Sequence, residues 1–336
     1  VLLLAGGSEL AAQAVILLVR STARALAGTP GQATGLLPQA SITQITQVGF
    51  FAVLGMIAVA RTATRAKAEV TVTVLAVALL LVLSAGVLRA DLTIDGIGQL
   101  LRPQFGRLGW SGAAEAIRLA LLTLGLTLGM GLAHGAALPG SRSILRTSMA
   151  LLLLVVGVTV LVLLLIATAL HPYQMPPLDG RALLLGQIPA VLGGEPEAAV
   201  SAAWYALVAL AGAAGGLAVL HSVVEQLVGR YGLRRRWGVV CAVGSAWVLS
   251  LLARFTGAPW AGPALLRSVA TDVLVPGATL GLAIFAGWAM SRRATRSELG
   301  MRRPAEFRLW RVLVRYVTPA VLALVLVAGV ARLIAG

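Results

Sequence analysis

The sequence predicts an all-α protein, a polytopic bundle of transmembrane helices. Apolar residues make up 59% of the 336-residue chain and charged residues only 12%, whereas a water-soluble domain is about 25% charged. The apolar residues form long continuous runs, and a membrane-spanning helix needs about 20 of them in sequence. A membrane β-barrel would instead show short segments of alternating polarity, so helices are expected.

Nine runs are long enough to be spans, and together they predict one transmembrane domain over residues 1–336. Charges or Pro/Gly clusters bound each run, as is typical of transmembrane helices. The runs cover residues 1–19, 43–60, 68–88, 112–138, 147–170, 200–228, 237–253, 265–290 and 310–334. The chain begins at Val1 rather than at a methionine, so we expect an upstream segment.

The fourth run, 112–138, contains glycines, each of which is unfavourable inside a helix by about 1 kcal/mol relative to alanine. Gly125, Gly129 and Gly131 lie near its centre, and Thr127 adds a hydroxyl. One interpretation is a helix that breaks in mid-membrane, where unpaired backbone groups line a cavity. The other is close packing against a neighbouring helix through small residues. Periodicity alone does not separate the two.

The basic residues predict the orientation in the membrane. Nine spans create two alternating sets of loops and ends, and one set (61–67, 139–146, 229–236, 291–311) holds sixteen Lys and Arg residues against nine in the other. Basic residues in short loops favour the cytoplasmic side, so this set is expected inside. The stretch RYGLRRRW (230–237) then anchors the inner face, with anionic lipid as the expected partner. A nucleic-acid partner, which the net charge of +15 would suggest, is not expected, because the charges are distributed over separate loops.

No constellation of residues predicts an enzyme. The three histidines have no paired spacing and the single cysteine, Cys241, has no cysteine partner, so no metal site, resident cofactor or catalytic residue is expected. The nucleophile-elbow, P-loop and zinc-protease motifs are absent.

Ionisable residues inside predicted spans are functional candidates by default. Asp272 lies in the eighth span, and exposure in a water-filled outer vestibule is the alternative reading for it. His221 and Glu225 lie four residues apart on one face of the sixth span. They are either a proton-titratable pair or a structural hydrogen bond.

Five stretches, in chain order, carry a family resemblance. They are LRPQFGRLGWSGAAEAIRLALLTLGLTLGMGLAHGAALPGSRSILRTS (101–148), GQIPAVLGG (186–194), LVALAGAAGGLAVLHSVVEQLVGRYGLRRRWGVV (207–240), VPGATLGLAIFAGWAMSRR (275–293) and FRLWRVLVRYVTPAVLALVLV (307–327). They resemble the neurotransmitter:sodium symporter family, in its bacterial amino-acid-transporting branch. The matching parts are the third outer loop with the unwound sixth helix, the loop over the outer vestibule, the eighth helix, the tenth and the eleventh.

The resemblance implies an inverted five-helix-repeat transporter fold in which the nine runs are the third to eleventh helices. The first two helices of the family have no counterpart in this chain, so the first repeat is incomplete. The resemblance also places the cytoplasm on the side with more arginines, and it favours the broken helix. It implies a substrate-binding segment at the break, made of Gly125, Thr127, Leu128, Gly129, Met130 and Gly131.

The ion sites depart from the family pattern. A threonine that serves one sodium in the family falls at Gly125, and a hydroxyl pair on the eighth helix falls at Ala214 and Gly215. A hard cation such as sodium prefers several oxygen ligands. Only backbone carbonyls remain for ion binding, at Ala211, Ala214 and Gly215, so sodium coupling is doubtful.

These inferences predict a secondary active transporter of the bacterial inner (plasma) membrane. It would move a small amino-acid-like solute by alternating access around the broken helix at 125–131. The alternative is a transport-inactive scaffold or accessory subunit that keeps the fold. The sequence leaves the substrate, the coupling ion and any homo- or hetero-oligomer open.

Overall fold

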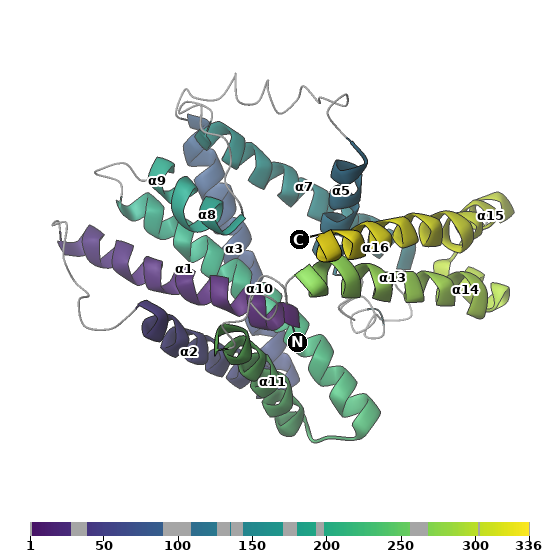
Figure 1. Cartoon of the computed structure of the whole chain (residues 1–336), viewed down its shortest axis with the longest axis horizontal. Coiled ribbons are helices and arrows are strands. Elements are labelled where there is room, and N and C mark those ends of the chain that lie inside the picture. Colours follow the sequence, from purple (N-terminus) through teal and green to yellow (C-terminus); the bar gives the residue numbers. More distant parts are fainter. Residues whose placement is uncertain are drawn as a thin grey trace. The chain divides into compact units, whose positions relative to one another are not determined.

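A computed structural model describes residues 2–27, 39–89, 109–125, 135, 144–170, 180–192, 198–255, 268–301 and 303–335. Within these ranges every regular element is a helix (Figure 1), which confirms the predicted all-α class. The contacts of the chain divide it into two compact units. Unit 1 comprises Val1–Pro103 and Thr159–Leu252, and unit 2 comprises Gln104–Val158 and Ala253–Gly336.

Unit 1 is built around the long helix α10 (Ala198–Tyr231). Packed with it are α1 (Leu2–Ala27), α2 (Gln39–Val59) and α3 (Thr62–Arg89), while α11 (Arg235–Phe255) follows it in the chain. The approach of α10 to α1 is close, because a Cβ added at Gly212 would come within 2.7 Å of the Ala11 Cβ. Small residues at a helix contact allow this approach inside a membrane, where burial from water does not drive association.

A buried polar cluster joins three helices of unit 1. The Gln47 side-chain amide donates hydrogen bonds to Ser8 Oγ at 2.8 Å and to Ser250 Oγ at 2.9 Å. The hydroxyl of Ser250 donates back to Gln47 Oε1 at 3.3 Å, and that of Ser8 donates to the carbonyl of Ala5. Since Gln47 is only 2% exposed, these bonds satisfy an amide that would otherwise be unfavourable in the apolar interior.

The segment 180–192, part of which resembles the family's loop over the outer vestibule, is a short broken helix. It consists of α8 (Gly180–Ala182), the π-helical turn η3 (Leu183–Gln187) and α9 (Ile188–Leu192). The Trp204 indole N–H donates to the carbonyl of Leu184 at 2.7 Å, and the Tyr205 hydroxyl donates to that of Leu185 at 3.1 Å. The segment is therefore docked on the first turns of α10.

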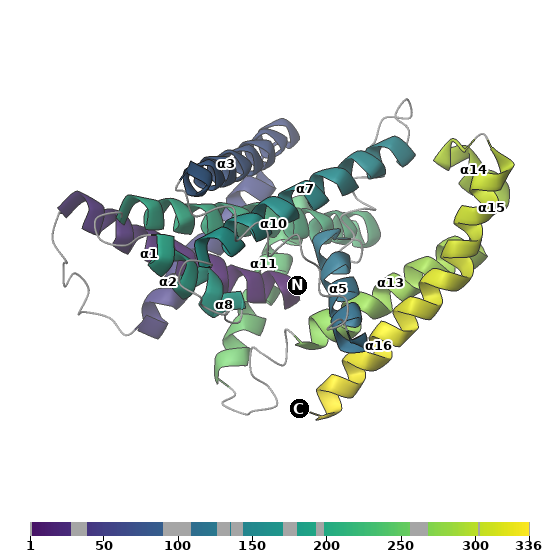
Figure 2. The same cartoon turned by 90° about the horizontal axis from the view of Figure 1, so that it is seen from above.

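Unit 2 contains two long composite helices that lie side by side (Figures 1 and 2). The first joins η4 (Val269–Leu274), α13 (Val275–Ile284) and η5 (Phe285–Ala289), and the second joins α15 (Pro304–Val312), η6 (Leu313–Val317) and α16 (Thr318–Ala335). The helix α14 (Arg292–Leu299) lies between them in sequence, and α5 (Trp110–Thr123) packs on both. The helix α7 (Ile144–Leu170) contributes residues to each unit.

Seven of the described helices are long and apolar enough to cross a membrane. They are Leu3–Ala23, Ser41–Val59, Thr62–Gly86, Ile144–Leu170, Ala199–Tyr231, Val269–Ala289 and Pro304–Ile334. Each coincides with one of the nine predicted runs, so the chain is an integral membrane protein. The two remaining runs differ: 237–253 forms α11, which opens on Arg235 and Arg236, and the described helix within 112–138 ends at Thr123. The single-domain prediction for residues 1–336 stays a prediction.

Candidate functional site

The helix α5 ends where the sequence predicts a break. Its last residue is Thr123, and Leu124 keeps right-handed dihedrals of φ −75° and ψ −11°. Gly125 follows with φ +59°, a left-handed conformation that glycine adopts without the Cβ penalty of other residues. Its N–H donates to the carbonyl of Leu122 at 3.1 Å, so the chain leaves the helix in a tight turn. The described helix of the fourth run therefore ends at this turn, and the mid-membrane break over 125–131 stays a prediction.

Gly125 is the one predicted substrate-binding residue that falls within the described residues, and it is buried. The remaining predicted substrate-binding residues are Thr127, Leu128, Gly129, Met130 and Gly131, and they lie outside the described part of the chain. Their role stays a prediction.

Unit 2 also contains a cluster of four charged side chains, which we call the Arg118 cluster. Its members are Glu115, Arg118, Asp272 and Arg332. The Arg118 guanidinium lies 3.2 Å from Asp272 Oδ1, and its Nε donates to Glu115 Oε2 at 2.9 Å. A second nitrogen of Arg118 contacts the other oxygen of Glu115. Arg332 Nη1 donates to Glu115 Oε2 at 3.0 Å, which brings α16 into the cluster.

The Arg118 cluster balances two positive and two negative charges. The side chains of Arg118 and Asp272 are only 17% and 13% exposed, so their attraction acts in a medium less polar than water. Thr271 Oγ1 also donates to Asp272 Oδ1 at 3.1 Å. Asp272 is thus paired and largely buried. Arg118 precedes Gly125 by seven residues, which is about 10 Å along the axis of α5. The ion pairs of the cluster therefore hold α5 in place about 10 Å from the turn.

Asp272 lies on η4, where the hydrogen-bond pattern widens to a π-helical turn, a feature often found at functional sites. The neighbouring helix α16 comes very close at this point. A Cβ added at Gly329 would overlap the backbone carbonyl of Asp272. The glycine therefore allows α16 to pack directly against the turn that carries the carboxylate.

The other two ionisable candidates belong to unit 1 and lie in one cluster with Arg65, Glu69 and Arg235, here called the Glu225 cluster. His221 Nδ1 is 3.8 Å from Glu225 Oε1, an ion-pair distance that is longer than a hydrogen bond. Glu225 instead accepts a hydrogen bond from Arg235 Nη1 at 2.7 Å. The structural-hydrogen-bond reading of the His221–Glu225 pair is not supported by this geometry.

Arg65 completes the Glu225 cluster from the start of α3. It is 7% exposed, and its guanidinium lies 4.0 Å from Glu225 and 3.9 Å from Glu69. Arg235 Nε donates to the carbonyl of Ala58 at 2.8 Å. The cluster therefore ties the end of α2, the starts of α3 and α11, and the last third of α10 together, at the end of unit 1 that the arginine count predicts to be cytoplasmic.

The predicted backbone ion ligands lie within the uninterrupted helix α10. Ala211 and Gly215 are exposed and Ala214 is half-buried. In a continuous helix each carbonyl already accepts a hydrogen bond from the residue four positions on. Only a second lone pair of each oxygen would be available to a cation, so the ion site stays a prediction with weak ligands. Among the described residues no group of three or more His, Cys, Asp or Glu side chains could hold a metal ion.

Sequence reasoning did not identify the arginine partners. Arg118 lies inside the fourth predicted run, and an ionisable residue inside a span is itself a functional signal. Glu115, three residues earlier, is on the same face of the helix. The i, i+3 pair could have been found from the sequence, whereas its neighbours Asp272 and Arg332 come from distant segments.

The sequence matches no family model and no curated protein. The structure is similar to the crystal structure of MhsT in complex with L-phenylalanine, with a TM-score of 0.75 and 16% sequence identity over 97% of this chain and 79% of MhsT. MhsT is a bacterial transporter of the neurotransmitter:sodium symporter family. The likeness shows the fold, which confirms the predicted helical transporter fold. The structural neighbour is a transporter and not an enzyme.

Proposed function

We propose that this membrane protein is a secondary transporter that moves a small amino-acid-like solute by alternating access. The observation that carries the proposal is the transporter fold shared with MhsT, whose crystal structure contains L-phenylalanine. The left-handed turn at Gly125, at the end of α5, adds local support. In transporters with broken helices, the interrupted backbone offers N–H and carbonyl groups to the solute near the membrane midplane.

The proposed substrate-binding segment is the chain from Gly125 to Gly131. Glycines at Gly129 and Gly131 would let a solute approach the backbone closely. The Thr127 hydroxyl would add one polar contact, and Met130 would face the side chain of the solute. A mostly apolar segment with a few polar groups suits a zwitterionic solute with an apolar side chain.

The proposed coupling to sodium is weak, because the ligands left to the ion are backbone carbonyls. At Ala214 and Gly215 the side chains supply no oxygen, and the carbonyls of α10 already accept helical hydrogen bonds. We propose that the protein acts in the bacterial inner membrane and that its transport depends little on sodium.

The test is uptake of radiolabelled L-phenylalanine into proteoliposomes that contain the purified chain, with and without a sodium gradient. We expect protein-dependent uptake that changes less than about tenfold when sodium is replaced by choline. The variant Thr127→Ala should lower uptake. The matched control is Thr123→Ala, because the Thr123 hydroxyl donates within its own helix, to the carbonyl of Ala120 at 3.0 Å.

The losses at Gly125, Ala214 and Gly215 also favour a second function, a scaffold or accessory subunit that keeps the fold without transport. The same measurement separates the two. If a panel of the twenty amino acids shows neither uptake nor binding with folded protein, with or without sodium, the transport proposal fails and the scaffold reading remains.

A further inference from the structure

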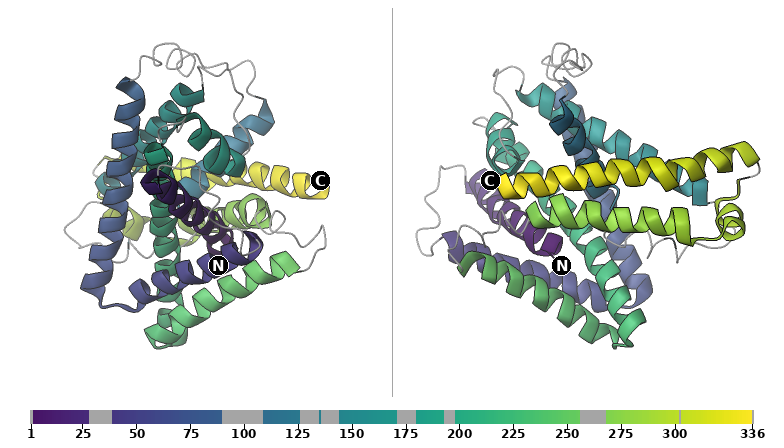
Figure 3. Two further views of the ribbon diagram at one scale, coloured as in Figure 1. Left: turned by 90° about the vertical axis from the view of Figure 1, so that its left-hand side faces the viewer. Right: turned by 45° about the vertical axis from the view of Figure 1, so that its right-hand side comes forward.

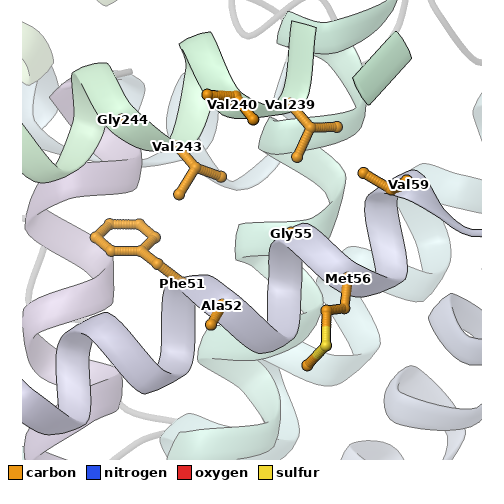
Figure 4. Close-up of a pocket in the computed structure, with 9 residues that line it drawn as sticks. All are labelled: Phe51, Ala52, Gly55, Met56, Val59, Val239, Val240, Val243 and Gly244. Carbon is orange, nitrogen blue, oxygen red and sulfur yellow. The ribbon is translucent and has the colours of Figure 1, made fainter. Parts of the chain in front are cut away.

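A groove of about 560 Å³ runs between α2 and α11 on unit 1 (Figure 4). Its walls consist only of apolar side chains and glycines. Figure 4 shows Phe51 of α2 and Val243 of α11 pointing into the space between the two helices, with Val239 further along. The two helices lie side by side in both views of Figure 3. A volume of this size is typical of a small-molecule site.

Glycines keep the groove open. A Cβ added at Gly244 would meet no atom within 4 Å, so this wall borders empty space. A Cβ added at Gly55 would lie in ordinary contact with Val239 and Val243, at 3.7 Å and 3.9 Å. The groove therefore narrows at Gly55 and is open at Gly244. From Phe51 to Val59 it extends about 12 Å along α2.

The groove ends where the two helices meet at the predicted cytoplasmic end. The hydrogen bond from Arg235 Nε to the carbonyl of Ala58 joins the first residue of α11 to the last turn of α2. Val59, the last residue of α2, lines the groove. The apolar lining therefore stops where α2 ends and α11 begins.

Two exposed arginines lie at this end. Arg236 precedes the groove residue Val240 by four positions, so both lie on the same face of α11. Arg61 follows Val59 by two residues. No ion pair links Arg61 or Arg236 to an acidic group of the described chain. The nearby carboxylates of Glu69 and Glu225 already belong to the Glu225 cluster.

Two exposed aromatic side chains mark the same level. Tyr231 is 68% exposed and Trp237 is 54% exposed, and the Arg236 guanidinium lies 6.0 Å from the centre of the Trp237 ring. Tyr and Trp concentrate at the boundary between the hydrocarbon and the lipid headgroups. An acyl chain in the groove would therefore have its headgroup beside the two arginines.

We propose that this groove binds one acyl chain of an anionic phospholipid, whose phosphate interacts with Arg236 and Arg61. Shape and apolar lining suit the chain, and unpaired positive charge suits the headgroup. A second copy of the protein is a poorer occupant, because it would place the same arginines against each other. The proposal does not depend on the transport function.

The test is native mass spectrometry of the purified full chain mixed with phosphatidylglycerol or phosphatidylcholine that carry the same acyl chains. We expect one tightly retained phosphatidylglycerol and a preference for it over phosphatidylcholine. Each arginine near a headgroup contributes about a fivefold preference. Arg236→Gln should therefore lower the preference about fivefold, and Arg293→Gln, an exposed arginine of α14, should leave it unchanged.

The variant Gly244→Leu should fill the groove and abolish retention of both lipids. Its control is Gly49→Leu, because Gly49 is an exposed glycine of α2 outside the groove whose added Cβ would also meet nothing within 4 Å. If Gly244→Leu does not fold, Gly55→Leu fills the groove from the α2 wall, because a Cβ at Gly55 already lies 3.7 Å from Val239.

Three results would overturn the proposal. The first is equal retention of the two lipids by the wild type. The second is unchanged retention by a folded groove-filling variant. The third is a dimer that Gly244→Leu converts to a monomer while lipid retention stays the same, since the groove would then be an interface between copies.

Discussion

The buried polar cluster of unit 1 allows a thermodynamic prediction. Replacing Gln47 by leucine keeps the side-chain volume similar but removes three hydrogen bonds, two to Ser8 and Ser250 donated by the amide and one accepted from Ser250. A hydrogen bond between membrane helices contributes about 0.6 kcal/mol, so the loss is about 1.8 kcal/mol. The Ser250 hydroxyl can turn to its own helix backbone, which lowers the expected destabilisation to about 1–1.5 kcal/mol.

The measurement is the free energy of unfolding in mixed detergent micelles titrated with dodecyl sulfate. Gln44→Leu, one turn away on α2, is the control. The informative variant is the triple substitution Ser8→Ala, Gln47→Leu and Ser250→Ala. Removing all partners together leaves no unsatisfied group, so the triple variant should be no less stable than Gln47→Leu alone. A triple variant less stable than the single one by more than 1 kcal/mol would show that the hydroxyls stabilise the fold independently of Gln47, and the reasoning would be wrong.

Further predictions concern the two units separately. Gly329→Leu would overlap the Asp272 carbonyl and should lower the melting temperature of the protein in detergent. Gly281→Leu, which has open space around it, should leave the melting temperature unchanged. Equal stability of the two variants would refute the close approach of α16 to η4. A double-mutant cycle with Arg118→Gln and Asp272→Asn should give a coupling energy of about 1 kcal/mol or more, because the pair is largely buried; zero coupling would contradict the ion pair. Gly212→Val should separate α10 from α1 and lower stability by about 1–3 kcal/mol, measured by the same titration.

The fold could be predicted to a large extent because membrane helices have a strong local signal. Long apolar runs with charged boundaries gave seven helices whose positions the structure confirms. The resemblance in five stretches led to the same transporter fold that the similarity to MhsT supports. For the run 112–138 periodicity leaves two interpretations open, because glycine serves both close packing and helix ends. The φ of +59° at Gly125 shows that this first glycine ends a helix.

The charged clusters were harder to predict because their members are distant in the sequence. Asp272 was a candidate from its place in a span, yet nothing local indicates that Arg118, 154 positions earlier, is its partner. The same holds for Arg65 and Glu225, which come from α3 and α10. Periodicity predicts which face of a helix a residue occupies, but not which helix lies opposite.

The two clusters differ in how they hold their helices, and the difference bears on how the proposed transporter would move. In the Glu225 cluster, Arg235 of α11 donates to a backbone carbonyl of α2 as well as to Glu225 of α10. Breaking the charge pair with α10 therefore leaves α11 bonded to α2. In the Arg118 cluster, the contacts that Arg118 and Arg332 make with other helices among the described residues end on carboxylates. Side-chain pairs can separate and re-form without disturbing a helical backbone, whereas a bond to a backbone carbonyl moves only with its helix.

We therefore expect the contacts of α5 with η4 and α16 to open more easily than the contacts of the Glu225 cluster. The test is the rate of cross-linking between pairs of cysteines placed at exposed positions next to each cluster, measured with and without L-phenylalanine. Adding the amino acid should change the cross-linking rate at the Arg118 cluster first. An equal change at both clusters would contradict the argument.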